Sequence, residues 1–326
     1  MIKRILKPTV AATMLLALGT NANAIDTGMG TVNGGIKALS ILSGDDNGYD
    51  PNSGSAFVLS LKYKSPTWNN LHMGVGFYYT NELLGLTDED SERVARGLFV
   101  NDDRSSKAFL GELYVKYTGS HYALYGGNMV FNSPLTTNAI STMPNFHRVY
   151  GVEATPPVEN LKLSLSHITH ISFGARSMAD FGLIGEGTGT AGTTIKPSTV
   201  EQAKFNKVSE ATLGANAADT NGLTVANIDY KLAGVNLSLW DYYADDIANT
   251  LYLEANKAFK VAGNKLKLNA QFLTQSNQGD NLAGDIDFQL LGLKAAYGNK
   301  KWGVLAAFNK SFGDSAMFNA WMGDPA

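Results

Sequence analysis

The sequence predicts an all-β fold, an antiparallel transmembrane β-barrel with about thirteen strands present. Three observations predict this fold. Apolar and polar side chains alternate within many segments, short and long connections alternate between those segments, and aromatic residues gather near the segment ends. Alternation with a period of two over roughly ten residues is typical of a strand with lipid on one side and water on the other.

The alternation is clearest in the segment 265–272. Leu266, Leu268, Ala270 and Phe272 share one face, and polar residues occupy the positions between them. Because successive side chains of a strand point to opposite faces, we expect this apolar row to face lipid and its polar neighbours to face a water-filled lumen.

The predicted strands follow one another along most of the chain. They cover residues 31–42, 55–64, 70–81, 107–117, 121–130, 146–155, 160–173, 221–232, 234–244, 247–259, 264–275, 285–297 and 301–311. No apolar stretch in this part of the sequence reaches the length of about 20 residues that a membrane helix needs, so strands are the elements expected to cross.

The connections between these strands are sorted by length. Short turns are expected at residues 65–69, 118–120, 156–159, 233–234, 261–263 and 298–300. They alternate with the connections at 43–54, 82–107, 131–145, 174–221, 244–246 and 276–284, of which only 244–246 is short. Outer-membrane barrels have short periplasmic turns and longer external loops, so this order favours a membrane barrel.

The longest connection contains one segment with helical spacing. Residues 199–213 are expected to form a short helix that either plugs the lumen or caps the outside of the barrel.

Aromatic residues lie where the strands should reach the ends of the barrel. The pairs that flank short turns are Tyr63 and Trp68, Tyr117 and Tyr122, and Tyr297 and Trp302. Amphipathic rings favour the depth of the lipid headgroups, so two aromatic girdles would produce this pattern. The alternative is aromatic packing in the core of a soluble β-sandwich, which the sorting of the connections by length disfavours.

The start of the chain has the pattern of a secretory signal peptide. A basic start is followed by an apolar run over residues 8–18 and by small residues at 22–24. The apolar run is too short to span a bilayer. We therefore predict Sec-type export, with residues 1–24 as the signal peptide and residues 25–326 as the barrel.

Charge and cysteine content exclude several classes of protein. The chain has 26 basic and 29 acidic residues, and removal of the three cations of the signal peptide leaves 23 against 29, a net charge of -6. A mildly acidic exported chain lacks the basic surface that nucleic acid binding requires. The absence of cysteine excludes disulfides, thiolate metal sites and thiol nucleophiles.

The number of strands is odd, whereas single-chain bacterial barrels have an even number. The last predicted strand is followed only by residues 313–326, which have the composition of a loop. An open sheet edge in lipid would leave unpaired backbone groups. Two explanations stand: a C-terminally truncated chain, which we favour, or an unrecognised strand.

Several short segments together suggest a family: Gly34–Lys37, Gly111–Tyr117, Ser133–Leu135, Met143–Phe146 with Gly151, Leu239–Tyr243 and Asp314–Trp321. They resemble the OprD family of outer-membrane porins. The resemblance implies a barrel of about eighteen strands that is narrowed by inward-folding loops. It also implies uptake of small nutrients, often carboxylates such as amino acids or short peptides, past a row of basic residues.

By position, residues 131–146 match the inward-folding third loop of that family. Family members often place an arginine where Ser141 and Thr142 stand here, and Arg148 lies beyond that position. This departure leaves the choice between anions and cations open.

A pore selects by the width and charge of its narrowest point. The loop residues predicted at the constriction are Ser133, Pro134, Asn145 and Arg148. The strand residues predicted to line the lumen are Lys62, Glu112, Lys116, Lys162, Glu254, Lys265 and Lys267. Opposite charges on opposite walls would create a transverse field that orients dipolar solutes.

The predicted function is passive, substrate-preferring diffusion of small hydrophilic solutes through the outer membrane, and not catalysis. The alternatives are an outer-membrane β-barrel hydrolase and an adhesin or structural barrel with a filled lumen. His167 and His170 have a spacing that suits zinc only on a helix, and on a regular strand they would lie on opposite faces. No catalytic residue, metal or cofactor is therefore predicted. The expected partners are membrane lipid, lipopolysaccharide, small solutes and further copies of the chain.

Overall fold

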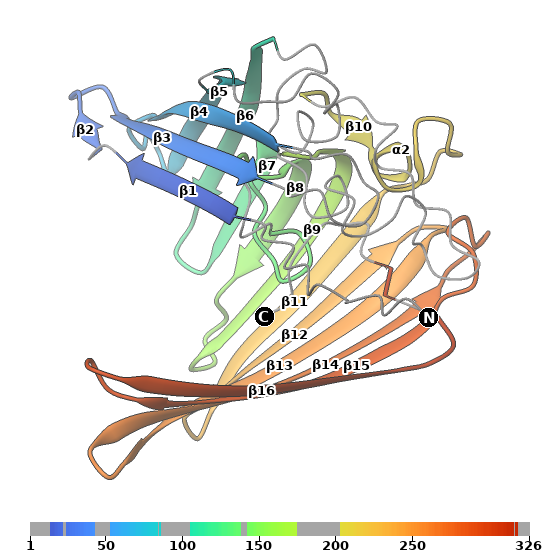
Figure 1. Ribbon diagram of the computed structural model, residues 1–326. Coiled ribbons are helices and arrows are strands. Elements are labelled where there is room, and N and C mark those ends of the chain that lie inside the picture. The colour runs from blue at the N-terminus through green and yellow to red at the C-terminus, as the bar shows by residue number, and fades with distance from the viewer. Residues whose placement is uncertain are drawn as a thin grey trace, which may run out of the picture.

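The computed structural model describes residues 14–21, 24–42, 53–83, 85, 105–137, 142–174, 203–315 and 317–318. Its secondary structure is nearly all β, in one 16-stranded sheet. The sheet curls into the wall of an open barrel, with β1 and β16 on opposite sides of the opening (Figure 1).

The first half of the sheet runs to β8. It contains β1 (Met14–Asn21), β2 (Ile25–Asp26), β3 (Thr31–Leu42), β4 (Ser53–Lys64), β5 (Leu71–Glu82), β6 (Lys107–Thr118), β7 (Tyr122–Met129) and β8 (Phe146–Ala154).

The second half begins at β9. It contains β9 (Leu161–Ser172), β10 (Asn206–Lys207), α2 (Val208–Leu213), β11 (Leu223–Leu232), β12 (Val235–Ala244), β13 (Ala248–Val261), β14 (Asn264–Asn277), β15 (Asp287–Gly298) and β16 (Gly303–Phe312).

The long strands form a meander in which neighbours in the sequence are neighbours in the sheet. The order is β1-β3-β4-β5-β6-β7-β8-β9-β11-β12-β13-β14-β15-β16, with β2 beside β3 and β10 beside β9. All the predicted strands are present, seven as β3 to β9 and six as β11 to β16. The predicted all-β antiparallel class is therefore confirmed, and the short link between β12 and β13 is also observed.

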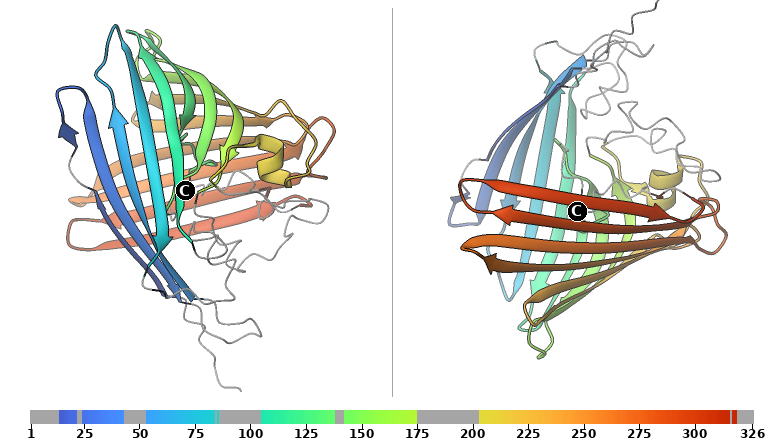
Figure 2. Two further views of the ribbon diagram at one scale, coloured as in Figure 1. Left: turned by 90° about the horizontal axis from the view of Figure 1, so that it is seen from above. Right: turned by 60° about the horizontal axis from the view of Figure 1, so that its bottom comes forward.

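Three shorter strands were not predicted. β1 pairs with β3 from Met14↔Leu42 to Asn21↔Gly35, so an apolar segment satisfies backbone groups along that edge. Residues 14–21 belong to the segment that the sequence marks as a signal peptide, and that assignment stays a prediction. No pairing joins β16 to β1 or β3 within the described ranges, so the sheet is open (Figure 2).

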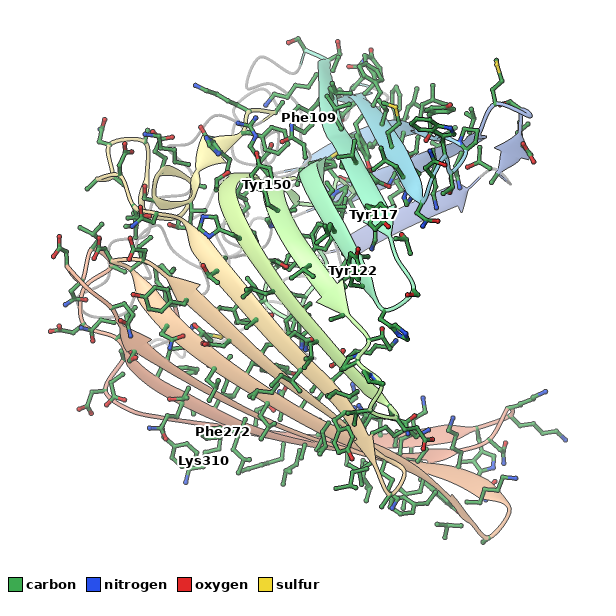
Figure 3. All side chains as sticks on the ribbon, turned by 180° about the vertical axis from the view of Figure 1, so that it is seen from behind. Phe109, Tyr117, Tyr122, Tyr150, Phe272 and Lys310 are labelled. Atoms are coloured by element: carbon green, nitrogen blue, oxygen red, sulfur yellow. The ribbon has the colours of Figure 1, made fainter. Side chains whose placement is uncertain are left out.

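The outer face of the sheet is apolar, as the alternation predicts. Leu268 and Phe272 on β14 are 42% and 37% exposed, and Figure 3 labels Phe272 on the outer surface. Phe272 pairs with Leu253 on β13 and with Leu291 on β15, and both are also exposed. A continuous apolar band across neighbouring strands is the surface that a lipid bilayer requires.

The predicted helix in the long connection is only partly present. α2 covers residues 208–213, β10 precedes it, and residues 199–202 lie outside the described part. Val208 and Ala211 are buried, as the spacing predicts. The Glu210 side chain accepts a hydrogen bond from the Lys207 backbone N–H at 3.2 Å, which closes the first turn. None of the described helices is long and apolar enough to cross a membrane.

Candidate functional site

The predicted strand residues on β4 and β6 share the inner face of the sheet. Lys62 on β4, Gly76 on β5 and Glu112 on β6 form one row of the backbone register. The next residues along these strands, Leu61, Phe77 and Leu113, are exposed and apolar. Because neighbouring side chains point to opposite faces, Lys62 and Glu112 face the lumen.

The other predicted strand residues lie on the same inner face. Lys116 follows Glu112 four residues along β6, and Lys162 on β9 pairs with Asp229 on β11. Glu254 on β13 pairs with Ser238 and Gln271. Lys265 and Lys267 alternate with the apolar row of β14. The structure thus gives these side chains access to the lumen, and their part in selecting solutes stays a prediction.

A charged pair spans three strands of this wall. Lys62 Nζ lies 2.9 Å from Glu112 Oε1, and their side chains are 45% and 12% exposed. The Tyr78 hydroxyl donates a hydrogen bond of 2.6 Å to the same carboxylate oxygen. The Lys62 ammonium also lies 5.6 Å from the centre of the Tyr78 ring, within cation–π range.

A second pair lies closer to the short-turn end. Lys116 Nζ lies 2.8 Å from Glu153 Oε2 and 5.4 Å from the Tyr125 ring centre. Both members belong to the wall of a hollow of about 510 Å³, which Lys64 and His72 also line. Two lysine cations, a histidine and a carboxylate therefore line a space large enough for a small solute.

The charges of this wall pair sideways and not across the lumen. Glu112 and Lys116 were expected to face the lumen from one face of a strand. Each pairs with a residue on a nearby strand of the same wall, Lys62 and Glu153 respectively. Side chains on strands one or two places apart meet more easily than side chains on opposite walls. The sequence did not mark Glu153 or Tyr78, although both are polar members of inward-facing positions.

The wall formed by β11–β13 holds its carboxylates with neutral donors. The Ser238 hydroxyl donates to Asp229 Oδ1 at 2.5 Å, and the Trp240 indole N–H donates to the Ser238 oxygen at 2.8 Å. The Tyr252 hydroxyl donates to Glu254 Oε2 at 3.1 Å. No ion pair to Asp229 or Glu254 occurs in the part of the chain that the structure describes. These two negative charges are therefore not offset by a lysine or arginine in contact.

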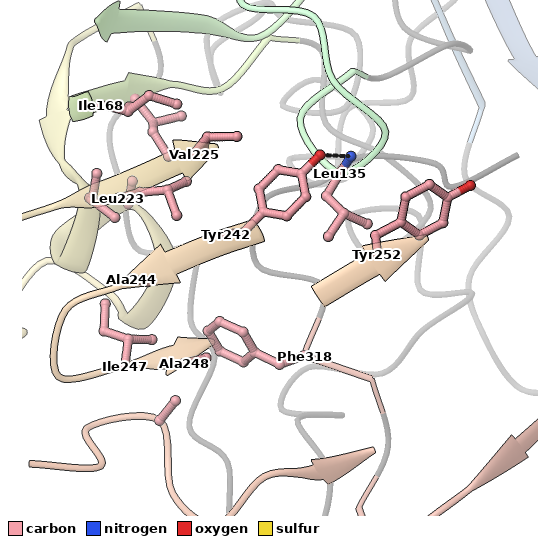
Figure 4. Close-up of a cluster of buried hydrophobic side chains, with 14 of the residues drawn as sticks. Leu135, Ile168, Leu223, Val225, Tyr242, Ala244, Ile247, Ala248, Tyr252 and Phe318 are labelled. Atoms are coloured by element: carbon pink, nitrogen blue, oxygen red, sulfur yellow. Dashed lines mark hydrogen bonds between the residues drawn. The ribbon is translucent and has the colours of Figure 1, made fainter. Parts of the chain in front are cut away.

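The loop between β7 and β8 reaches this second wall. The Leu135 backbone N–H donates to the Tyr242 hydroxyl at 3.3 Å, across a separation of 107 residues (Figure 4). Leu135 and Tyr242 are both fully buried. They belong to one apolar cluster with Tyr252, Ile168 and Phe318.

The loop residues predicted at the constriction bond mainly to the protein. The Ser133 hydroxyl lies 2.7 Å from that of Thr136. The Asn145 side chain donates to the Thr136 carbonyl at 3.2 Å and accepts from the Gly174 N–H at 3.1 Å. Ser133 and Asn145 are buried, and Pro134 is half-buried. These contacts stabilise the loop, so the side chains of Ser133 and Asn145 have little surface to offer a solute.

Arg148, the remaining predicted residue, is half-buried at the start of β8. Its Nε donates to Asn128 Oδ1 at 3.0 Å, and its guanidinium lies 5.5 Å from the Phe205 ring centre. The arginine is thus positioned by β7 and by the segment before β10.

The segment after β16 also folds inward, against β14 and the neighbouring second wall. The Gln275 side chain accepts from the Phe318 N–H at 2.9 Å and donates to the Phe318 carbonyl at 3.0 Å. Phe318 is fully buried. The sequence did not mark Gln275, and its place at an inward position near the end of β14 is the only signal that could have done so.

The two histidines of β9 differ from the sequence prediction. β9 has a bulge, so His167 pairs with Tyr150 and His170 pairs with Arg148, which are two residues apart on β8. The prediction that the two histidines lie on opposite faces is therefore wrong. Their Nδ1 atoms contact different threonines, His167 with Thr224 at 3.1 Å and His170 with Thr169 at 2.9 Å.

One electrostatic contact lies outside the spanning strands. Asp219 raises the pKa of Lys207, chiefly through a side-chain hydrogen bond and also through its charge. The pair links the start of α2 to the segment that leads into β11.

An antiparallel meander with an apolar outer face and a polar, charged inner face defines the class of membrane-spanning β-barrel channels, or porins. Within that class the chain belongs to the OprD family of outer membrane porins, whose sequence model matches residues 113–325. The resemblance drawn from short segments is thereby confirmed. Proteins of this family are substrate-specific channels of the bacterial outer membrane.

Solved structures show the same fold. OccAB3 of Acinetobacter baumannii matches with a TM-score of 0.63 and 17% identity, over 88% of this chain and 67% of that one. OpdK of Pseudomonas aeruginosa, solved with vanillate, matches with a TM-score of 0.62 and 17% identity, over 81% of this chain and 62% of that one. OccK8 (OprE) of the same organism matches with a TM-score of 0.63 and 14% identity, over 96% of this chain and 72% of that one.

The chain therefore spans between 62% and 72% of the length of these three proteins. At such low identities the match shows the fold alone. A search of the curated proteins finds no match.

Proposed function

We propose that this chain forms a channel for passive, substrate-preferring diffusion of small hydrophilic solutes, narrowed by the loop at residues 131–145. The contact between Leu135 and Tyr242 carries the proposal. The loop leaves β7 and meets β12, and β8, β9 and β11 lie between these strands in the sheet. In a curled sheet such a contact runs across the concave side, so the loop occupies part of the lumen.

The preferred solutes are proposed to carry a carboxylate. Lys62 and Lys116 face the lumen, and Lys64 lines the hollow beside Lys116. Two proteins of similar fold were solved with carboxylate ligands, OpdK with vanillate and OccK2 (OpdF) of Pseudomonas aeruginosa in complex with glucuronate. An ammonium group in a lumen raises the local concentration of anions and so favours their passage.

Planar-bilayer recording of the complete mature protein tests the proposal. Discrete conductance steps, reduced by millimolar vanillate or glucuronate, are expected. The Lys116→Gln variant should weaken that block, because it removes a cation from the hollow. A folded barrel that carries no ionic current would contradict the channel function, and a current unaffected by either carboxylate would contradict the preference.

We propose that the chain is not an enzyme, in keeping with the channel function of its family. The hydrolase alternative predicts lipid or peptide hydrolysis that disappears in His167→Ala or His170→Ala. The adhesin alternative predicts a filled lumen without conductance. The same bilayer recording and a hydrolysis assay on one preparation separate the three functions.

We also propose Sec-type export with removal of residues 1–24, contact with outer-membrane lipid and lipopolysaccharide, and assembly of several copies. The apolar band on β13–β15 supports the lipid contact. N-terminal sequencing of protein from the outer membrane should begin at Ile25. Retention of Met1 would contradict the export proposal. Cross-linking in native membranes tests the assembly.

A further inference from the structure

We propose that Glu112 sets the selectivity of the lumen by acting as a built-in counter-ion for Lys62, with Tyr78 as the residue that positions it. The inference rests on the proposed channel function. Lys62 faces the lumen with its charge already offset, so a solute carboxylate must compete with Glu112 for the ammonium group.

A glycine makes the contact between these two strands geometrically feasible. Lys62 and Glu112 lie on β4 and β6, and Gly76 lies between them in the same row of the register. A Cβ atom at residue 76 would lie 2.8 Å from Glu112 Oε1 and 3.0 Å from Glu112 Cβ. With glycine there, the Glu112 side chain lies flat across β5 and reaches the ammonium group on β4.

The carboxylate is held more firmly than the lysine. Glu112 accepts hydrogen bonds or ion-pair contacts from Tyr78 and Lys62 at the same oxygen, at 2.6 Å and 2.9 Å. Its side chain is 12% exposed, against 45% for Lys62. Burial strengthens the interaction between two charges because less water screens them. The anion therefore stays in the wall while the cation is open to solutes.

The pair of Lys116 and Glu153 provides a matched comparison within the same wall. Its ion pair is similarly short, at 2.8 Å, but there the lysine side chain is 25% exposed and the glutamate side chain is 52% exposed. No tyrosine hydroxyl donates to Glu153 among the described residues. An exposed carboxylate is screened by water and ions, so Glu153 offsets its lysine less completely.

The test is the anion-to-cation permeability ratio of the complete protein, measured from reversal potentials in a low-salt KCl gradient. Glu112→Gln keeps the shape of the side chain and removes its charge. We expect a roughly two- to fivefold rise in the ratio, and tighter block by glucuronate. Tyr78→Phe should move the ratio in the same direction by a smaller factor, because the carboxylate loses its positioning bond.

Two further variants separate pairing from a simple change in charge. In the Lys62→Gln background, Glu112→Gln should change the ratio and the glucuronate block less than it does in the wild-type protein, because no ammonium group is left for it to offset. Glu153→Gln, which removes one charge in the same wall, should change the block less than Glu112→Gln does. Equal effects of Glu112→Gln with and without Lys62 would overturn the inference.

A wild-type protein that folds but carries no current contradicts the channel itself. A conducting wild-type protein in which Glu112→Gln leaves the ratio and the block unchanged contradicts only the counter-ion role. Heat-modifiable migration in gels shows whether each variant has folded. If a single variant does not fold, the double variant, in which both side chains are neutral, is measured in its place.

Discussion

The inner face of β4–β8 and the inner face of β11–β13 hold their carboxylates differently. On the first, Glu112 and Glu153 each contact a lysine. On the second, Asp229 and Glu254 accept hydrogen bonds from Ser238 and Tyr252. The first wall therefore carries offset charges, whereas the second presents negative charge that no cation of the described residues contacts.

The difference follows from what lies between the charged residues. Glycine at position 76 gives Glu112 room to cross a strand and reach Lys62. On β11–β13 the strand between the two carboxylates is β12, and its inward residues Ser238 and Trp240 are themselves donors. The second wall also receives Leu135 and Phe318 from two connecting segments. One wall is thus organised for charge pairing, and the other for anchoring segments that fold inward.

Shortening the Leu135 side chain, which holds the loop at residues 131–145 on the second wall, should change the conductance most. Leu135→Ala removes a fully buried side chain from the cluster on the second wall. We expect a loss of about 2 to 5 kcal/mol of packing free energy at that site, enough to undock the loop. Single-channel conductance should rise. Pro134→Ala, at a half-buried neighbouring position, is the control, and unchanged conductance in Leu135→Ala would contradict the anchoring role.

An arginine placed on the outer face of β14 should destabilise the protein more than an arginine placed on its inner face. Leu268→Arg places a cation on the outer face, and we expect a loss of about 2 to 4 kcal/mol in the free energy of unfolding if the residue lies at the bilayer midplane. Asn269→Arg, one residue further on the inner face, should cost much less. Urea titration of the protein in lipid vesicles measures both. Equal losses would show that the face assigned to lipid is wrong.

Removal of the unpaired carboxylates should have a smaller effect, on selectivity and not on stability. Asp229→Asn and Glu254→Gln each remove a negative charge that, within the described ranges, no lysine or arginine contacts. We expect the cation-to-anion permeability ratio to fall roughly twofold in each, more at low salt than at high salt. Reversal potentials measure it. A salt-independent ratio would contradict an electrostatic role for this wall.

The smallest change expected is the loss of one hydrogen bond to the loop. Tyr242→Phe removes the acceptor of the Leu135 N–H bond but keeps the buried ring. We expect a cost of about 1 kcal/mol in loop docking. Single-channel records of this variant should show more frequent openings and closures than those of the wild-type protein. A variant that behaves like Leu135→Ala would show that the hydrogen bond, and not the packing, holds the loop.

Local pattern was enough to predict the strands, but not the contacts between side chains of the lumen. The row from Leu266 to Phe272 was correctly assigned to the outer face. Lys62, Glu112 and Lys116 were correctly expected on the inner face, whereas their lateral pairing was not. The face of His170 was wrong because a bulge in β9 shifts the alternation by one residue, and no residue type in the segment marks that bulge.

The sequence by itself determined the class of this protein, because a period of two in hydrophobicity is a direct consequence of strands that separate lipid from water. It also implied that the strands joined by short turns are neighbours in the sheet, as the structure has them. Only the tertiary structure decided which charges meet and where the loop at residues 131–145 docks. Those contacts depend on the stagger of strands and on a partner 107 residues away, and a local pattern contains neither.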